Sequence, residues 1–444
     1  MLDTPDDRKP QRGVPTVSAR LGDGRMVELV VGEDGATRLA QWDGERASLE
    51  TVVTAPQGLR LVPYSRSNSL IRNRIVLFAT EPRDYPSKQV LLDAVAAYIY
   101  RYVDISPEFL QLVTHYVLLT WVYDRFSELP YLRLRGDFGS GKTRFLLVVG
   151  SICYKPIFAS GASTVSPIFH MLDAFRGTLL IDEADFRFSD EKAQIVKILN
   201  NGNARGFPVL RTEAKNGGHE FSPRAFNVYG PKLVAMRGEF DDPALESRFV
   251  TERSDRRQLR SDIPINLPDS QAQEALSLRN QLLMFRFRTT AIATQSGFGS
   301  DERLEPRLRQ IFGPLAAMID NPEARAVLGR WATASHAALI DRRAATVEAD
   351  VLMALRVLAV SQPNQALALK EIARVFGTSF GADYAYGATP RWIGEILRKR
   401  LSINTHKSHG VFVVPLAETR KLKELWQRYA ISEDEAREVA ARQK

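Results

Sequence analysis

Eight consecutive residues constrain this chain more than any other segment: Gly136, Asp137, Phe138, Gly139, Ser140, Gly141, Lys142 and Thr143. They fit the pattern G-x-x-x-x-G-K-[ST], in which backbone N–H groups cradle phosphate. Residues 131–135 alternate as a strand does, and residues 145–149 are apolar, as at the start of a buried helix. Strand and helix patterns continue to alternate after the loop, which predicts a doubly wound α/β sheet.

The chemistry of phosphate binding explains the residue types in this loop. Glycines let the backbone approach phosphate without a Cβ in the way, and the next helix directs its positive end at the same oxygens. Lys142 supplies a charge for the β- and γ-phosphates, and Thr143 offers a hydroxyl to Mg²⁺. We therefore predict that all eight residues bind ATP and that Thr143 is also a metal ligand. The alternative is a glycine-rich turn that only resembles such a loop.

A pair of acidic residues follows further along the chain. Residues 177–181 carry no charge, which is typical of a buried parallel strand, and the next two residues are Asp182 and Glu183. The carboxyl ends of parallel strands meet at one edge, so both carboxylates are predicted to lie beside the loop. We predict that Asp182 holds Mg²⁺ and that Glu183 orients and deprotonates the attacking water, as in a hydrolase. The alternative is an acidic strand end that caps the next helix.

Residues 233–249 contain the phrase Asp-Pro-Ala-Leu-Glu-Ser-Arg-Phe and resemble the fourth strand, sensor region and arginine finger of AAA+ ATPases. The resemblance covers about residues 88–360. It implies that Arg248 is the finger, which reaches the γ-phosphate of ATP on a neighbouring subunit, so that the site is complete only in a ring. Arginine suits this role because its planar, always charged group grips phosphate with two nitrogens. A surface arginine without this role is the alternative.

The same resemblance implies two further catalytic arginines. The first sensor position of the family usually carries Asn or Thr, but this chain has Met236 there, so the adjacent Arg237 is expected to take the polar role. In the helical region that follows, Arg307 corresponds to the second sensor arginine. Arg309 or a surface role for Arg307 is the alternative.

Residues 208–213 and 219–228 are strand-like and flank a Lys-Asn-Gly-Gly turn, which predicts a β-hairpin. Its position resembles the pre-sensor-1 hairpin of minichromosome-maintenance helicases, viral superfamily-three helicases and bacterial enhancer-dependent activators. In helicases this hairpin points into the pore of the ring. The resemblance implies that Arg211 and Lys215 touch the phosphates of single-stranded DNA. The alternative is a solvated surface hairpin.

The C-terminal region is basic: residues 364–428 carry 11 Lys and Arg against 5 Asp and Glu. Its pattern predicts a helix over 367–376, a second helix over 389–399, and a hairpin with strands at 403–406 and 411–414. This order resembles a winged helix-turn-helix. The resemblance implies contacts with duplex DNA from the second helix and the wing, through Arg391, Arg398, Lys399 and Lys407. A protein-binding winged helix is the alternative.

The whole chain has a net charge of +8, which is compatible with a nucleic-acid partner. No apolar run is long enough to span a membrane and the single cysteine excludes a disulfide framework, so we expect a cytoplasmic protein without a membrane partner. We expect these divisions: a flexible tail (1–20), a small β-rich module (21–87), a helical lead-in (88–130), the AAA+ nucleotide-binding core (131–260), a helical lid region (261–362), a winged-helix domain (363–430) and a C-terminal tail (431–444).

Together these features resemble the helicase-like AAA+ ATPases found with mobile genetic elements. The resemblance implies a ring, expected to be a hexamer, that uses ATP and Mg²⁺ to move along or unwind DNA during replication. A primase or another replication protein is a candidate partner. Two other functions remain open: a loader that ATP switches onto DNA without processive movement, and an initiator whose winged helix reads an origin sequence.

Overall fold

The computed structural model describes residues 13–159, 164–182, 189–215, 220–254, 260–289, 304–381, 384 and 388–442. The chain divides into two units, residues 1–332 and residues 333–444. The boundary falls inside helix α10 (Pro322–Ala344), and therefore within the range 261–362 that the sequence analysis assigned to a single helical lid.

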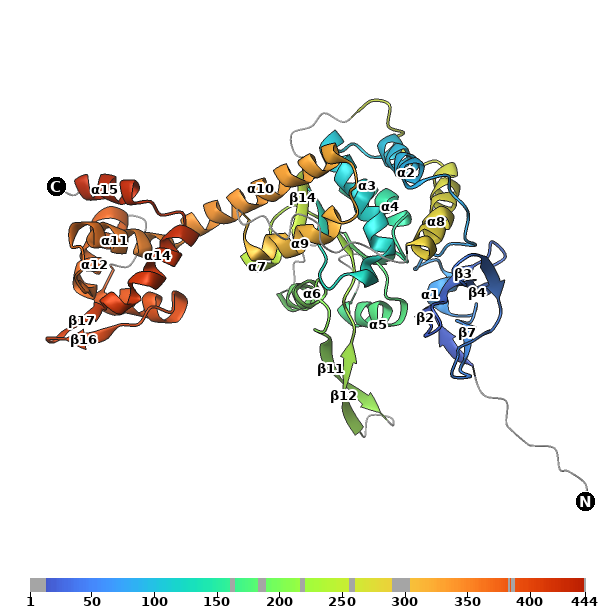
Figure 1. Cartoon of the computed structure of the whole chain (residues 1–444), viewed down its shortest axis with the longest axis horizontal. Helices are drawn as coiled ribbons and strands as arrows, with labels where there is room; N and C mark the ends of the chain where they lie inside the picture. The colour runs from blue at the N-terminus through green and yellow to red at the C-terminus, as the bar shows by residue number, and fades with distance from the viewer. Residues whose placement is uncertain are drawn as a thin grey trace, which may run out of the picture. The chain divides into compact units, whose positions relative to one another are not determined.

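The first unit begins with short strands in two small sheets, of order β2-β3-β4-β5 and β1-β7-β6 (Figure 1). The strands are β1 (Val14–Thr16), β2 (Ser18–Arg20), β3 (Met26–Val31), β4 (Thr37–Trp42), β5 (Ala47–Glu50), β6 (Val53–Thr54) and β7 (Arg60–Pro63). The expected flexible tail is therefore wrong for residues 14–20, where β1 pairs with β7 and β2 pairs with β3. These residues are ordered because Val17 packs into the core and is only 6% exposed.

The centre of the first unit is a parallel sheet of five strands in the order β14-β8-β13-β10-β9, which confirms the α/β class. Residues 233–236 belong to the fourth of these strands along the chain, as the resemblance implied. Because all five strands are parallel, their carboxyl ends lie along one edge of the sheet. The strands are β8 (Tyr131–Arg135), β9 (Ile157–Ala159), β10 (Leu179–Ile181), β13 (Lys232–Met236) and β14 (Phe249–Arg253).

Helices α2, α3, α4 and α8 pack against one another, and α5 packs against α6 (Figure 1). Helix α8, which the sequence analysis assigned to a lid, is instead a mostly buried helix of this group. The helices of the first unit are α1 (Ser69–Arg72), α2 (Lys88–Tyr102), α3 (Pro107–Trp121), η1 (Tyr123–Arg125), α4 (Lys142–Ser151), α5 (Val165–Phe175), α6 (Ser189–Asn201), α7 (Pro243–Glu246), α8 (Ser270–Arg288) and α9 (Pro306–Ala316).

The predicted hairpin forms between α6 and β13. Its strands β11 (Val209–Lys215) and β12 (Glu220–Phe226) pair antiparallel along their whole length, from Val209 opposite Phe226 to Lys215 opposite Glu220. Figure 1 shows the hairpin projecting from the body of the unit. The turn between the two strands lies outside the described residues.

A buried cluster of charges joins the N-terminal strands to the rest of the first unit. Glu28 on β3 is 1% exposed, and its carboxylate accepts hydrogen bonds from Lys155 Nζ at 2.8 Å and from Arg286 Nε on α8 at 2.7 Å. The hydroxyl of Tyr154 also donates to Glu28 at 2.8 Å. Loss of one partner would leave a buried charge uncompensated, so the cluster fixes these strands against the core.

The second unit holds the C-terminal helices and a three-stranded sheet of order β15-β17-β16. The helix that the sequence predicts over 389–399 begins at Pro390, with Thr389 as its N-cap. The elements are α11 (Val347–Ser361), β15 (Leu367–Ala368), α12 (Leu369–Phe380), α13 (Pro390–Glu395), η5 (Ile396–Arg400), β16 (His406–Ser408), β17 (Val411–Val414), η6 (Leu416–Glu418), α14 (Thr419–Arg428) and α15 (Glu433–Ala441).

Three expectations for this region are wrong. Helix α11 belongs with the C-terminal helices rather than with a lid, because it packs against α12, α14 and α15. The C-terminal tail is helix α15, which Ser432 caps with Glu435 and which buries Ala436 completely. The wing turns at His409 and Gly410, with φ of +47° and +84°, so Lys407 lies in strand β16 and not in the turn.

Candidate functional site

The glycine-rich loop lies between β8 and α4, at the carboxyl edge of the parallel sheet. Gly139 and Gly141 have φ of +75° and +79°, the left-handed region that strains other residues. A Cβ at Gly136 would collide with the side chains of Ser254 and Ser140. Glycine is therefore favoured at all three positions, and the loop can expose backbone N–H groups to an anion.

Lys142 is the first residue of α4, and its half-buried side chain folds over the loop. Its Nζ donates hydrogen bonds to the carbonyl oxygens of Gly136 and Asp137, both at 2.6 Å. Ser140 Oγ also donates to Asp137 O at 2.8 Å. The ammonium group thus lies at the same loop that presents the N–H donors, which is the arrangement a phosphate requires.

The structure brings together the two predicted metal ligands. Thr143 Oγ1 in the first turn of α4 donates to Asp182 Oδ2 at the end of β10, at 2.8 Å. Among the described residues, no group of three or more His, Cys, Asp or Glu gathers at one place. Mg²⁺ needs no such group, because it usually takes one or two protein oxygens together with substrate phosphates and water. Glu183 lies outside the described residues.

Arg237 also lies at this edge of the sheet. It follows β13, and its Cζ is 3.2 Å from the ring centroid of Phe138, which is 78% exposed on the glycine-rich loop. Met236 is only 2% exposed, and its backbone oxygen accepts a hydrogen bond from Gly136 N at 3.3 Å. The buried Met236 therefore offers its backbone to the loop, while the adjacent Arg237 offers its charge.

Arg248 lies at the amino ends of the parallel strands, opposite the carboxyl ends where the glycine-rich loop lies. It precedes β14, and its backbone oxygen accepts from Tyr131 N at the start of β8, whereas the glycine-rich loop follows the end of β8. Arg248 is 9% exposed, and its side chain donates to Asn203 Oδ1 at 2.9 Å and also to Asn200. One chain therefore does not bring Arg248 to its own glycine-rich loop.

The charge of Arg307 acts on Arg248. Burial lowers the pKa of Arg248, and the nearby positive charge of Arg307 in the first turn of α9 lowers it further. Burial raises the pKa of Glu128, while the charges of Arg307 and Arg248 act in the opposite direction. The charge of Arg307 therefore acts on both Arg248 and Glu128.

Local contacts explain the residues of the segment Asp-Pro-Ala-Leu-Glu-Ser-Arg-Phe (242–249). Asp242 caps α7 by accepting from Ala244 N at 2.8 Å, with Pro243 in the first turn. Glu246 then forms a two-pronged ion pair with Arg133 of β8, at 2.6 and 2.5 Å. These contacts fix α7 against the sheet, and thereby the position of Arg248 two residues later.

The pair between Glu246 and Arg133 is buried, with side chains 4% and 3% exposed. We expect Glu246→Gln to lower the free energy of unfolding by about 3–5 kcal/mol, because it leaves a buried guanidinium uncompensated. Glu81→Gln is the matched control, since Glu81 pairs with Arg83 at the surface, where such pairs contribute at most about 1 kcal/mol. Urea denaturation measures both values. Equal losses in the two variants would contradict the assignment.

Of the two hairpin residues that are predicted to contact DNA, Arg211 packs against the core of the first unit. Arg211 on β11 lies over the ring of Phe169, with Cζ 4.1 Å from the centroid, and donates to Gln194 of α6. Its guanidinium therefore lies at the base of the hairpin. Lys215 is the last residue of β11, and its side chain lies outside the described residues.

Sequence reasoning missed Lys232, whose single charge at the start of a strand gave no signal. Lys232 is completely buried, and in its protonated form Nζ donates to three backbone oxygens, those of Val228 and Gly230 at 2.9 Å and that of Gly202 at 3.2 Å. These bonds connect the chain that returns from the hairpin to the end of α6. Lys232 therefore fixes the base of the hairpin.

Burial lowers the pKa of Lys232 from 10.5 to about 7. Between these values the unfolded chain binds a proton at this side chain that the folded protein does not, so the contribution of Lys232 to stability rises as the pH increases. We expect the free energy of unfolding of the wild type to rise relative to that of Lys232→Met between about pH 7 and about pH 9. Urea denaturation at each pH measures this difference, and groups common to both proteins cancel. A difference that does not change with pH would contradict the prediction.

The four predicted duplex-DNA contacts are all exposed in the second unit. Arg391 lies in α13, and Lys407 lies in β16. Arg398 donates to Thr405 Oγ1 at 2.8 Å, and Lys399 pairs with Glu395 one turn earlier. Within the described part of the chain, Lys399 forms an ion pair, whereas Arg391 and Lys407 form none.

None of the helices among the described residues is both long enough and apolar enough to cross a membrane. No model of a known protein family matches the sequence, and no curated protein matches it.

Several solved structures align with much of the chain at low identity. The apo C-terminal region of NrS-1 aligns at 8% identity with a TM-score of 0.40, over 88% of this chain and 96% of that one. The active helicase Cch of SCCmec type IV aligns at 11% identity with a TM-score of 0.38, over 93% and 100%. A full-length MCM homologue from Methanopyrus kandleri aligns at 12% identity with a TM-score of 0.35, over 68% and 69%. Because these TM-scores are below 0.5, we base the assignment of function on this chain's own residues.

Proposed function

We propose that this chain is an ATP-hydrolysing motor that assembles into a ring, expected to be a hexamer, and moves along or unwinds DNA during the replication of a mobile element. The contact between Thr143 and Asp182 beside the glycine-rich loop carries the proposal. It joins the two halves of a nucleotide site that are far apart in the sequence. Few other functions require a cradle of N–H groups, a lysine and a pair of metal-ligand oxygens in one place.

In this proposal the loop 136–141 binds the phosphates through its N–H groups, and Lys142 adds a positive charge. Thr143 and Asp182 hold Mg²⁺, which when bound neutralises charge on the phosphates. Glu183 accepts a proton from the attacking water, and Arg237 stabilises negative charge at the same edge of the sheet.

A neighbouring copy supplies the remaining charge. Arg248 lies away from the glycine-rich loop of its own chain and the charge of Arg307 acts on it, which supports a role at the nucleotide of another copy. Arg248 would first exchange its hydrogen bonds to Asn200 and Asn203 for bonds to phosphate. The two asparagines hold the side chain in one orientation until then.

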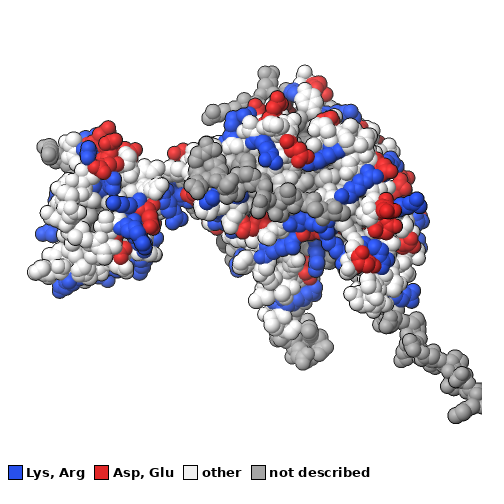
Figure 2. Space-filling view, viewed as in Figure 1, with Lys and Arg blue, Asp and Glu red and all other residues white. Residues whose placement is uncertain are grey.

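Two regions would contact DNA. Figure 2 shows Lys and Arg side chains gathered where the hairpin joins the core, which favours contact with a polyanion. The hairpin would touch single-stranded DNA in the pore through Lys215, with Arg211 at its base. In the second unit, helices α12 and α13 with the sheet β15-β17-β16 support a winged-helix domain, and Arg391, Arg398, Lys399 and Lys407 would bind duplex DNA.

Strand displacement on a forked DNA substrate tests this function. A motor separates the strands with ATP and Mg²⁺ but not with a non-hydrolysable ATP analogue. The exposed basic residues of the second unit favour one other candidate, an ATP-switched loader or initiator that binds DNA without moving along it. For that protein, the analogue would support DNA binding fully and no strands would separate with ATP.

Lys215→Ala is expected to remove the stimulation of ATP hydrolysis by single-stranded DNA while leaving the basal rate unchanged. The reason is that Lys215 would touch the DNA backbone and not the nucleotide. Phosphate release with and without DNA measures both rates. Lys197→Ala, an exposed lysine of α6 outside the hairpin, is the control and should retain full stimulation. Loss of the basal rate in Lys215→Ala would indicate a role in folding instead.

A further inference from the structure

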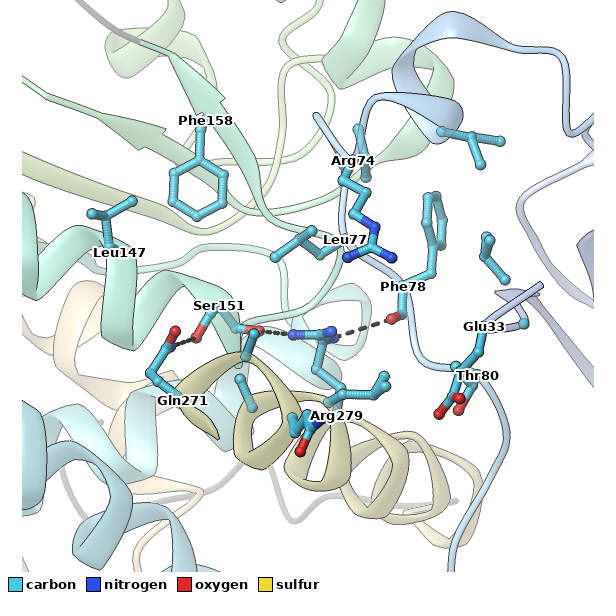
Figure 3. Close-up of a pocket in the computed structure, with 18 of the residues that line it drawn as sticks. Glu33, Arg74, Leu77, Phe78, Thr80, Leu147, Ser151, Phe158, Gln271 and Arg279 are labelled. Atoms are coloured by element: carbon cyan, nitrogen blue, oxygen red, sulfur yellow. Dashed lines mark hydrogen bonds between the residues drawn. The ribbon is translucent and has the colours of Figure 1, made fainter. Parts of the chain in front are cut away.

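A cavity of about 680 Å³ lies within the first unit, between the N-terminal strands, α4, β9 and α8 (Figure 3). Sites for small organic molecules usually have volumes of about 300–1,000 Å³. The cavity is lined by the middle and end of α4, whereas the glycine-rich loop precedes this helix. It is therefore separate from the proposed nucleotide site.

Much of the cavity wall is apolar. Leu147 of α4 is 44% exposed although its neighbours Leu146 and Val148 are buried, because its side chain faces this space. Figure 3 shows Leu147, Phe158 and Leu77 around one part of the cavity. Such a wall fits the hydrocarbon or aromatic body of a ligand.

A buried cation also faces the cavity. Arg279 of α8 is 7% exposed, and it donates to Phe78 O through Nε at 3.1 Å and to Ser151 O through Nη1 at 2.6 Å. Both acceptors are neutral carbonyls, and Arg279 forms no ion pair within the described ranges of the chain. A buried charge is normally paired, so this guanidinium lacks a counter-charge of the kind an anion would supply.

A second arginine points into the same space. Arg74 lines the cavity and follows α1, and Figure 3 shows its guanidinium directed towards that of Arg279. Burial, opposed by the charge of Tyr98 and assisted by that of Arg74, lowers the pKa of Arg279 to about 10. Glu33 also lines the cavity but pairs with neither arginine. Two like charges that converge on an apolar cavity favour an anion between them.

We propose that this cavity binds a small organic anion, with its apolar body against Leu147, Phe158 and Leu77 and its acidic group between Arg74 and Arg279. A carboxylate and a phosphate monoester both have the required charge, and both can accept two arginines. This inference goes beyond the proposed motor function and does not depend on ATP hydrolysis.

The fluorescent anion 8-anilinonaphthalene-1-sulfonate is the probe for this site, and N-phenyl-1-naphthylamine is its uncharged counterpart. Titration of the full chain should show binding of both, with the anion tighter. Arg74→Gln should weaken binding of the anionic probe by about tenfold or more, which is the usual cost of losing one charge-assisted hydrogen bond. The same variant should change the affinity for the uncharged probe by less than about twofold. Arg74 forms no side-chain hydrogen bond among the described residues, so this variant is expected to fold normally.

Two further variants locate the site. Arg72→Gln removes the same charge from an exposed arginine that does not line the cavity, and it should leave both probes unchanged. Ala272→Trp fills the cavity from α8 and should weaken both probes. Equal effects of Arg74→Gln and Arg72→Gln, or unchanged binding in Ala272→Trp, would overturn the proposal.

Competition identifies the source of the acidic group. Octanoate should displace the fluorescent anion if a carboxylate occupies the site, and phenyl phosphate should displace it if a phosphate monoester does. Displacement by either compound supports the proposal, and displacement by neither overturns it. Lys142→Ala should bind both probes as the wild type does, so the outcome is independent of whether the chain hydrolyses ATP.

Discussion

Lys142→Ala is expected to reduce ATP hydrolysis by at least about a hundredfold, the usual cost of removing one preorganised charge from a developing negative charge. In the structure Nζ of Lys142 lies 2.6 Å from two carbonyl oxygens of the glycine-rich loop, so its charge is already at the phosphate cradle. Because the lysine is half-buried at the surface, its removal should leave the fold intact. Steady-state phosphate release measures the rate, and titration with a fluorescent ATP analogue measures the affinity.

Lys192→Ala is the matched control for this experiment. Lys192 pairs at the surface with Asp241, whose side chain is 92% exposed. The Lys192→Ala variant should therefore hydrolyse ATP at the wild-type rate. A near-normal rate in Lys142→Ala would refute the nucleotide site. An equal loss in both variants would show that the charge of the surface, rather than the loop, sets the rate.

Arg248→Ala is expected to reduce turnover by about a thousandfold or more, as for arginines that complete a neighbour's site. Mixing it with Lys142→Ala should restore part of the activity. The reason is geometric: Arg248 and the glycine-rich loop lie at opposite ends of the parallel strands, so each variant retains the half of the joint site that the other lacks.

The rescue separates catalysis from folding. Arg248 also bonds to Asn203 and Asn200, so its loss removes packing as well as charge. Asn203→Ala removes one of these bonds and keeps the arginine, and it should retain most of the turnover. If mixed oligomers of Arg248→Ala and Lys142→Ala form but remain inactive, Arg248 does not act on a neighbouring copy.

Local patterns predicted the core of the first unit well. The loop before Lys142, the strand that precedes it and the strand that precedes Asp182 all lie where the sequence indicated. Each depends on neighbouring residues: glycines at the turns of a loop, an alternating strand, or an uncharged strand. The hairpin was equally clear, because two strand-like runs flank a glycine-rich turn.

Features that depend on distant residues were not predictable. The cluster of Glu28, Lys155 and Arg286 joins three segments, and no one segment signals it. Helix α15 resembled a polar tail because only one side of it packs, against α11. The end of the strands at which Arg248 lies also became clear only from the parallel pairing of β14 with β8.

The central claim is that two copies of the chain build each nucleotide site together. ATP turnover per chain, measured over a dilution series with the particle mass determined in the same samples, tests it most directly. The account predicts that turnover per chain falls as the assembly dissociates, and that it approaches zero for single chains. Full turnover by single chains, unchanged on dilution, would contradict it.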